Sequence, residues 1–285
     1  MLSGIGEPLV DKQFVKRAEY AHAKGVARFA TSTNAALLFH EKGLEILNVG
    51  MGSIIISLDA FNKETHSRIR YGLDFSETMD NVKRFIENRY AQGSQISIQL
   101  LFVTHAENED EFRDFFNFWL PLPSKQDHIR MTQRHNLGKY YFLAIASSNK
   151  QCQDPFNMMQ IWADETVPTC CVDMENENLL GNTNQNTLLE IFNGLRFSTM
   201  RSMHARGRRK NLKLCRTCNV PETGARLFKR TGNETTMLGS WFGRSYEDQT
   251  PVRIGGEIKR SFPNDPWALS PNFKTAYDRA KIEKI

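Results

Sequence analysis

The sequence lacks the features that define several classes of protein. None of its apolar runs approaches the ~18 residues that a membrane span requires, and its first residues lack the basic and then apolar order of a secretory signal peptide. It also lacks the concentrated positive charge of a dedicated nucleic-acid binder, since its net charge is +5 over 285 residues. These absences predict a cytoplasmic protein that binds neither membrane nor nucleic acid.

Cysteine is absent from the first 151 residues, and all five cysteines lie between Cys152 and Cys218. An odd number of closely spaced cysteines without a secretory signal argues against a disulfide framework. Cys215 and Cys218 have the Cys-x-x-Cys spacing at which a turn directs two thiolates toward one metal. Ligand softness does not separate zinc from iron–sulfur, so the residues alone favour the two about equally. The seven histidines are scattered and form no visible ligand pair.

Residues 1 to 132 alternate between strand and helix patterns. A glycine-rich loop is expected to follow the end of a strand near residue 4. Strands are then predicted at 26–32, 54–59, 95–103 and 128–132, and helices at 15–24, 37–47, 78–90 and 112–119. Gly25 is expected to end the first helix, and Asn108 with Glu111 to form a capping box before the last. This alternation implies an α/β fold of parallel β–α units, in which ligands bind at the carboxyl ends of the strands.

Polar residues and glycines stand at three of those predicted strand ends. Each alone is more often a strand terminus or a helix cap than a ligand, but their common position favours a site. The segments read Gly-Ile-Gly-Glu-Pro-Leu at 4–9, Ser-Thr-Asn at 32–34 and Ile-Ser-Leu-Asp at 56–59.

These three segments resemble the second, third and fourth strand ends of the radical S-adenosylmethionine (radical SAM) enzymes. The resemblance runs from residue 1 to about residue 222 and implies a partial (β/α)6-type barrel that lacks its first unit. It implies that Gly6, Glu7 and Pro8 bind the amino group of S-adenosylmethionine. The same resemblance implies that its ribose and carboxylate are held by Ser32, Asn34, Ser57 and Asp59. An ammonium group favours carbonyls and a carboxylate in a concave loop, which glycine lets the backbone approach.

The family's catalytic [4Fe-4S] cluster is held by a Cys-x-x-x-Cys-x-x-Cys loop upstream of the Gly-Glu-Pro loop, and no cysteine precedes Cys152 here. We therefore expect either that an upstream segment is missing from this chain or that the protein is a degenerate relative without radical chemistry. The first is favoured because Met1 falls inside an expected barrel strand. No catalytic residue is assigned.

The cysteine-rich stretch is similar to the SPASM or twitch auxiliary-cluster domain of the same family. Its expected elements are a hairpin of strands 156–163 and 167–173, a Leu-Gly-Asn turn at 180–182 and a helix at 187–193. The resemblance favours iron–sulfur over zinc and implies one auxiliary [4Fe-4S] cluster bound by Cys152, Cys170, Cys215 and Cys218. Cys171 competes with Cys170, because adjacent strand residues face opposite sides. In the family the ligand is spaced from a glycine in the hairpin, and here Glu165 stands in place of that glycine. The choice between Cys170 and Cys171 therefore stays open.

The predicted organisation is an incomplete barrel at 1–148, an auxiliary-cluster domain at 149–222 and an extension at 223–285 with a helix at 273–282. In intact form, the implied protein generates a 5′-deoxyadenosyl radical that abstracts hydrogen from a peptide, sugar or other small substrate. Flavodoxin or ferredoxin is the implied electron donor. The alternative is a non-catalytic iron–sulfur or zinc module that binds a peptide or protein partner through the barrel mouth and the basic run 196–216.

Overall fold

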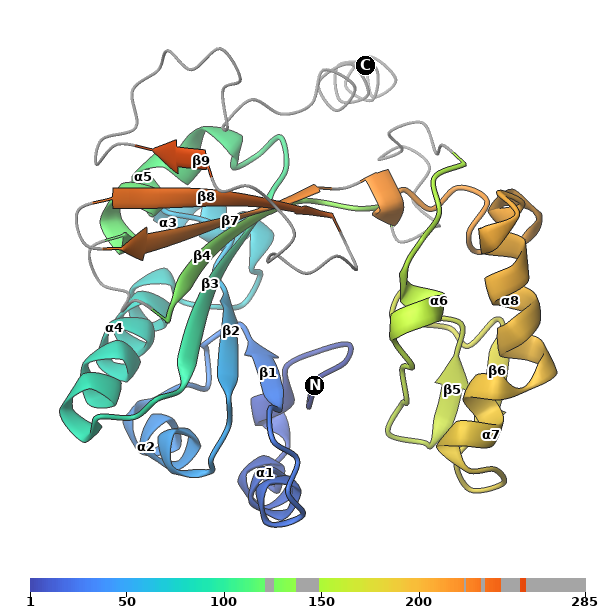
Figure 1. Cartoon of the computed structure of the whole chain (residues 1–285). Helices are drawn as coiled ribbons and strands as arrows, with labels where there is room; N and C mark the ends of the chain where they lie inside the picture. The colour runs from blue at the N-terminus through green and yellow to red at the C-terminus, as the bar shows by residue number, and fades with distance from the viewer. Residues whose placement is uncertain (121–125, 137–148, 223, 232–233, 242–251, 255–285) are drawn as a thin grey trace. The chain divides into compact units, whose positions relative to one another are not determined.

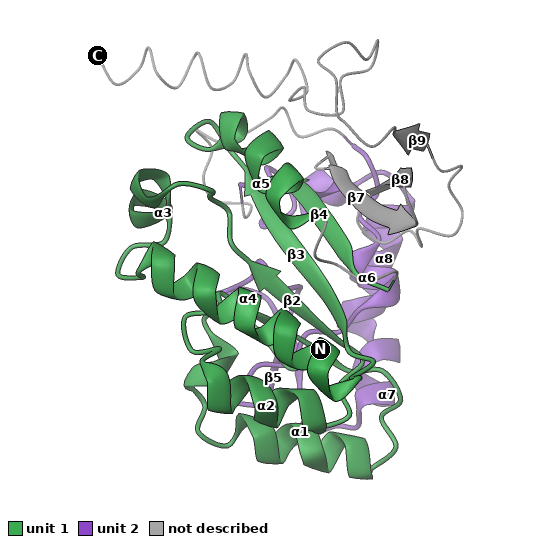
Figure 2. Ribbon diagram, turned by 90° about the vertical axis from the view of Figure 1, so that its left-hand side faces the viewer, with its two compact units in different colours: residues 1–132, 226–238, 250–267 green, residues 133–225, 239–249, 268–285 purple. Residues whose placement is uncertain are grey.

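The computed structural model describes residues 1–120, 126–136, 149–222, 224–231, 234–241 and 252–254. The chain divides into two compact units (Figure 2). The described residues of unit 1 lie within 1–132, 226–238 and 252–254, and those of unit 2 lie mainly within 133–225. Among the described residues, no helix is both long enough and apolar enough to span a membrane.

Unit 1 alternates strands and helices, as predicted. Its first elements are η1 (Pro8–Val10), α1 (Phe14–Ala23), β1 (Ala30–Thr33), α2 (His40–Asn48), β2 (Ser53–Ser57) and α3 (Lys63–Ile69). They are followed by α4 (Phe75–Gln92), β3 (Ser97–Thr104), η2 (Glu109–Glu111), α5 (Phe112–Trp119) and β4 (His128–Gln133). β1, β2 and β3 pair in parallel, and β4 lies next to β3. The predicted α/β class is therefore confirmed.

The helices of unit 1 cover one face of its sheet. Figures 1 and 2 show α1, α2 and α4 on the same side of β1, β2 and β3. β3 alternates half-exposed and buried residues along its whole length, and its buried Phe102 ring lies 5.2 Å and 4.9 Å from those of Phe112 and Phe115 on α5. Each large apolar side chain buried in this way contributes roughly 1.5–3 kcal/mol. A parallel sheet with helices on one face is the arrangement of a partial barrel.

Glycines end two helices, and Gly25 is the one that was predicted. Gly25 follows α1 with φ +75°, and Gly93 ends α4 with φ +62° while its amide donates to the carbonyls of Arg89 and Tyr90. Both adopt the left-handed conformation that glycine reaches without a Cβ clash. The prediction for the first residues was wrong, because they form no strand. The Leu2 amide donates to the Ala30 carbonyl at 2.7 Å, which places the segment beside β1.

The predicted capping box before α5 was also wrong. The Asn108 side chain accepts from the His105 amide at 2.8 Å and donates to the carbonyls of Asp59 and Val103 at 2.7 and 2.9 Å. Glu111 accepts from the amides of Phe61 and Asn62 at 2.6 and 3.1 Å. Both side chains therefore join loops distant in sequence, because such bonds satisfy backbone groups that a helix cap would leave open.

Unit 2 consists of short elements. They are α6 (Asp154–Asn157), β5 (Thr166–Pro168), β6 (Leu179–Asn182), α7 (Leu188–Asn193), α8 (Leu195–Ala205), η4 (Arg209–Asn211) and η5 (Val220–Glu222). The predicted helix at 187–193 is confirmed as α7, with Thr187 and Glu190 forming a capping box. The predicted hairpin was wrong, because β5 pairs antiparallel with β6, Val167 lying opposite Gly181. Only the turn at Asp164 and Glu165 is as expected, since the Glu165 amide donates to the Trp162 carbonyl at 3.0 Å.

The segment after residue 222 contributes strands that the sequence did not indicate. They are β7 (Gly224–Thr231), β8 (Glu234–Trp241) and β9 (Val252–Ile254). The sheet order is β1-β2-β3-β4-β7-β8-β9, so β7 extends the sheet from β4. The helix predicted at 273–282 lies outside the described residues.

Candidate functional site

The first predicted site lies at the carboxyl ends of β1 and β2. Glu7 is the N-cap of η1, and its carboxylate accepts hydrogen bonds from the Leu9 amide at 3.0 Å, the Thr33 hydroxyl at 2.7 Å and the Asn34 amide at 2.7 Å. Gly6 precedes it with φ +95°, and Pro8 is the first residue of η1. The Gly-Glu-Pro loop is thus fixed to the end of β1, although the Glu7 oxygens already have protein donors.

A second group of bonds surrounds Asp59. Its carboxylate accepts from the Val103 amide at 2.8 Å and pairs with Arg70, which also donates to the Ser57 hydroxyl at 2.6 Å. Asp59 is buried and has φ +59°, a left-handed conformation that is uncommon outside glycine, asparagine and aspartate. This carboxylate is therefore already paired with a cation of the chain.

The β1–β2 register explains how the predicted strand-end residues share an edge. Thr33 lies opposite Ile56, so the next positions, Asn34 and Ser57, stand at adjacent strand ends, while the half-buried Ser32 lies one residue before Thr33. Sequence reasoning missed Thr33 and Arg70, which hold the two carboxylates. Thr33 lay inside a quoted motif, and no sequence signal linked Arg70 to Asp59.

Glu7→Gln is expected to lower the free energy of unfolding by about 2 kcal/mol, because the amide nitrogen replaces an oxygen that accepts a charge-assisted bond from the protein. Chemical unfolding measures the change. Glu19→Gln is the matched control, since Glu19 is exposed on α1. Equal stability of the two variants would show that the Glu7 carboxylate does not fix the loop.

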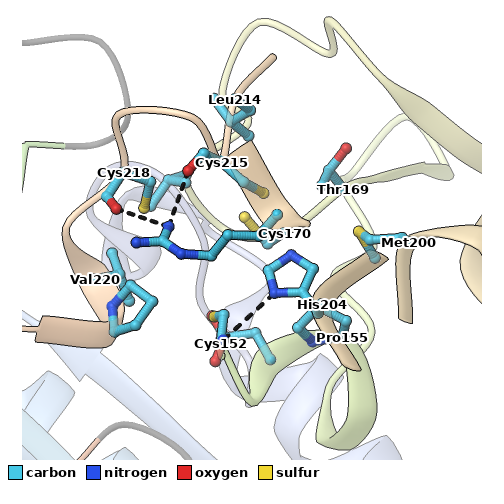
Figure 3. Close-up of a pocket in the computed structure, with 14 residues that line it drawn as sticks. Cys152, Pro155, Thr169, Cys170, Met200, His204, Leu214, Cys215, Cys218 and Val220 are labelled. Carbon is cyan, nitrogen blue, oxygen red and sulfur yellow. Dashed lines mark hydrogen bonds between the residues drawn. The ribbon is translucent and has the colours of Figure 1, made fainter. Parts of the chain in front are cut away.

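The second predicted site is a pocket in unit 2. Four of the five cysteines, Cys152, Cys170, Cys215 and Cys218, line this pocket together with His204 (Figure 3), whereas Cys171 is not among its lining residues. All five are free cysteines. Cys152 precedes α6, Cys170 follows β5, and the Cys-x-x-Cys pair lies between η4 and η5. The fold thus brings three separate segments together at the cysteines that the sequence singled out.

Two buried charged side chains hold the cysteine loops in place. Arg209 is 1% exposed, and its Nη1 donates to the carbonyls of Cys215 and Cys218 at 2.9 Å each. Asp173 is 0% exposed, and its carboxylate accepts from the amides of Thr169, Glu177 and Asn178 at 3.3, 2.9 and 3.2 Å. Cys170 and Cys171 therefore lie in a turn closed by Asp173, and the strand alternation that was expected to separate them does not apply.

The pocket raises the pKa of its thiols. Burial raises the pKa of Cys215 to about 12, and the neighbouring Cys218 adds to the rise. Burial is also the largest cause that raises the pKa of Cys152 and Cys170. These thiols are therefore protonated at neutral pH, and thiolates in this pocket require a cationic centre to offset their desolvation.

The residues of the pocket fit an iron–sulfur cluster in donor type. A tetrahedral zinc site with bonds of about 2.3 Å brings its sulfurs within about 3.8 Å of one another. Within the described residues, no three Cys, His, Asp or Glu side chains meet closely enough to hold one metal ion. A four-iron cluster takes four cysteine thiolates around a larger core, so its ligands stand farther apart. Four thiols around one pocket suit that group, with Val172, Leu214 and Val220 as its apolar wall.

Comparison with known families identifies the family to which the chain belongs. A model described as the radical SAM superfamily matches residues 1–118, and a model described as an iron–sulfur cluster-binding domain, SPASM, matches residues 152–219. The chain is a radical SAM/SPASM protein. The predicted strand-end residues all fall within the radical SAM match, and the four candidate cysteines fall within the SPASM match.

The radical SAM/SPASM protein is also distantly similar to solved structures. They include BtrN in complex with AdoMet and 2-DOIA, at 19% identity and TM-score 0.47, and histidine-tagged anSMEcpe with bound AdoMet, at 15% identity and TM-score 0.42. Each similarity covers 75% of this chain and 69% of the other. No curated protein matches the sequence significantly.

Glu165 lies in the turn before β5 and has φ +67°. A left-handed conformation costs an L-residue about 1–2 kcal/mol, and the extra freedom of glycine in the unfolded chain offsets part of this cost. Glu165→Gly is therefore expected to stabilise unit 2 by about 0.5–1 kcal/mol. Thermal unfolding checks this against Glu165→Ala, which keeps a Cβ and is expected to bring no gain. The prediction would be contradicted if Glu165→Gly were less stable than the wild type while Glu165→Ala kept the wild-type stability.

Proposed function

We propose that Cys152, Cys170, Cys215 and Cys218 hold one auxiliary [4Fe-4S] cluster of a radical SAM/SPASM enzyme. The observation that carries the proposal is the convergence of these four cysteines, from three segments, on one pocket. When bound, such a cluster supplies one-electron transfer or a site that anchors substrate. The free thiols suit a reducing compartment such as the cytoplasm.

The chain's own residues prepare this site. Arg209 joins the carbonyls of Cys215 and Cys218, which keeps the two thiols at the ends of one short loop. Asp173 closes the turn that carries Cys170. Both side chains are buried, so their bonds are shielded from water and restrict the loops more strongly than surface bonds would.

We propose that unit 1 forms the part of the barrel that faces S-adenosylmethionine. Gly6 and Pro8 would present the loop backbone to the ligand's amino group, with Glu7 orienting the loop through Thr33 and Asn34. Ser32, Asn34, Ser57 and Asp59 would lie toward its ribose and carboxylate. In the intact enzyme, the proposed chemistry is hydrogen abstraction from a peptide, sugar or other small substrate, with a flavodoxin or ferredoxin as electron donor.

One observation favours a second candidate, a non-catalytic iron–sulfur module that binds a partner. The carboxylates of Glu7 and Asp59 are already bonded to the protein. Calorimetry separates the two candidates. Weak binding of S-adenosylmethionine by this chain supports the strand-end site, because in the family the catalytic cluster normally chelates the methionine end of the ligand, and complete absence of binding supports the module. Within the basic run, Arg196 and Arg201 donate to the carbonyls of Leu179 and Phe192.

Anaerobic reconstitution with iron and sulfide tests the cluster. About four iron and four sulfide per chain, with visible absorption, is the expected result for one [4Fe-4S] cluster. Stoichiometric zinc in the purified chain, with neither iron uptake nor visible absorption, would contradict it.

A further inference from the structure

His204 is a buried residue of the cysteine pocket, and a cluster held by four thiolates does not need it as a ligand. It lies near the end of α8, is 2% exposed and lines the pocket with the four candidate cysteines (Figure 3). A buried side chain with two polar nitrogens requires partners for both.

The bonding of the two ring nitrogens differs. Nδ1 accepts from the Cys152 amide at 3.4 Å, whereas Nε2 is buried and has no hydrogen-bond partner among the described residues. Because Nδ1 acts as the acceptor, the single ring proton is on Nε2. A buried N–H donor therefore lines the pocket without an acceptor.

We propose that His204 donates a hydrogen bond from Nε2–H to the iron–sulfur cluster held by the four cysteines, and that this bond raises the cluster's reduction potential. The inference rests on the proposed function, since it requires the cluster. Sulfide and thiolate sulfurs are acceptors, and a donor near them favours the more negative reduced state. His204 is a positioning and tuning residue in this proposal rather than a metal ligand.

Two variants separate the two nitrogens. In His204→Asn the side-chain oxygen reaches about as far as Nδ1 and can still accept from the Cys152 amide, but no donor reaches the Nε2 position. In His204→Gln a donor reaches the Nε2 position, but the acceptor for Cys152 is lost. We expect His204→Asn to lower the ratio of reduced to oxidised cluster at a fixed potential about tenfold, a shift of about 59 mV to more negative potential. His204→Gln is expected to stay near the wild-type potential.

The measurement is a redox titration of each reconstituted chain, followed by electron paramagnetic resonance. A shift in His204→Gln but not in His204→Asn would overturn the proposal, because it would assign the role of His204 to holding Cys152. Equal potentials in all three chains, each with four iron, would overturn it while leaving the cluster intact. A wild-type chain that takes up zinc and no iron would overturn the proposed function and this inference together.

A measurement on the wild type covers the case in which a variant does not take up iron. With ¹⁵N-labelled histidine, the reduced cluster is expected to show a weak nitrogen coupling and an exchangeable proton coupling. A strong nitrogen coupling would identify His204 as a direct ligand, and no coupling would exclude the hydrogen bond. Either of these results would overturn the proposal.

Discussion

Replacing Cys215 and Cys218 together by alanine is expected to reduce the iron and sulfide of the reconstituted chain from about four of each to none. The two residues supply half of the proposed ligands from one loop, and their carbonyls are fixed by the same buried guanidinium of Arg209. The remaining two thiols come from separate segments and cannot hold a four-iron cluster alone. Iron and sulfide analysis after anaerobic reconstitution, with the visible spectrum, measures the loss.

Cys171→Ala is the matched control for this experiment. Cys171 neighbours Cys170 in the turn closed by Asp173 but does not line the pocket. We expect this variant to retain iron, sulfide and absorption at the wild-type level. Loss of the cluster in Cys171→Ala, with retention in Cys170→Ala, would show that the pocket was assigned to the wrong member of the pair.

Asp173→Asn is expected to destabilise the turn that carries Cys170 by about 2 kcal/mol. The carboxylate accepts three backbone amides, and an asparagine side chain would face at least one of these donors with its own amide nitrogen. A change of 2 kcal/mol corresponds to roughly a thirty-fold more frequent opening of the turn. Loss of cluster iron to a chelator, followed by absorbance, should accelerate by about that factor if opening limits the loss.

The control for this prediction is Asp164→Asn. Asp164 also accepts from a backbone amide, that of Thr166, but its side chain is exposed. Water can replace the lost bond, so no measurable change in iron loss is expected. Similar rates in the two variants would mean that Asp173 does not hold the turn.

Local sequence signals were sufficient to predict the alternating part of the fold. Gly25 ends the first helix as predicted, because the conformation that it needs is local. The helix predicted at 187–193 also forms, and it begins with a capping box whose two residues are only three apart. The same reasoning failed at Asn108 and Glu111, whose side chains bond residues up to 50 positions away. Local rules contain no information on such bonds.

The sequence indicated which cysteines could form the candidate site, but not which hydrogen bonds would hold them in place. The spacing of Cys215 and Cys218 and the resemblance to the SPASM domain together implied four particular thiols, and these four line one pocket. The buried residues that position the thiols were not predicted. Arg209 belongs to the basic run 196–216, which was considered as a surface for a partner, and Asp173 was placed in a strand. Their roles depend on burial within the folded unit, which composition and spacing do not show.

The central claim is that four particular thiols hold one four-iron cluster. Anaerobic native mass spectrometry, combined with alkylation of the cysteines, tests this claim directly. We expect the added mass of one four-iron, four-sulfide cluster, with Cys152, Cys170, Cys215 and Cys218 protected from alkylation and Cys171 reactive. One bound zinc, or protection of Cys171 in place of Cys170, would contradict the account.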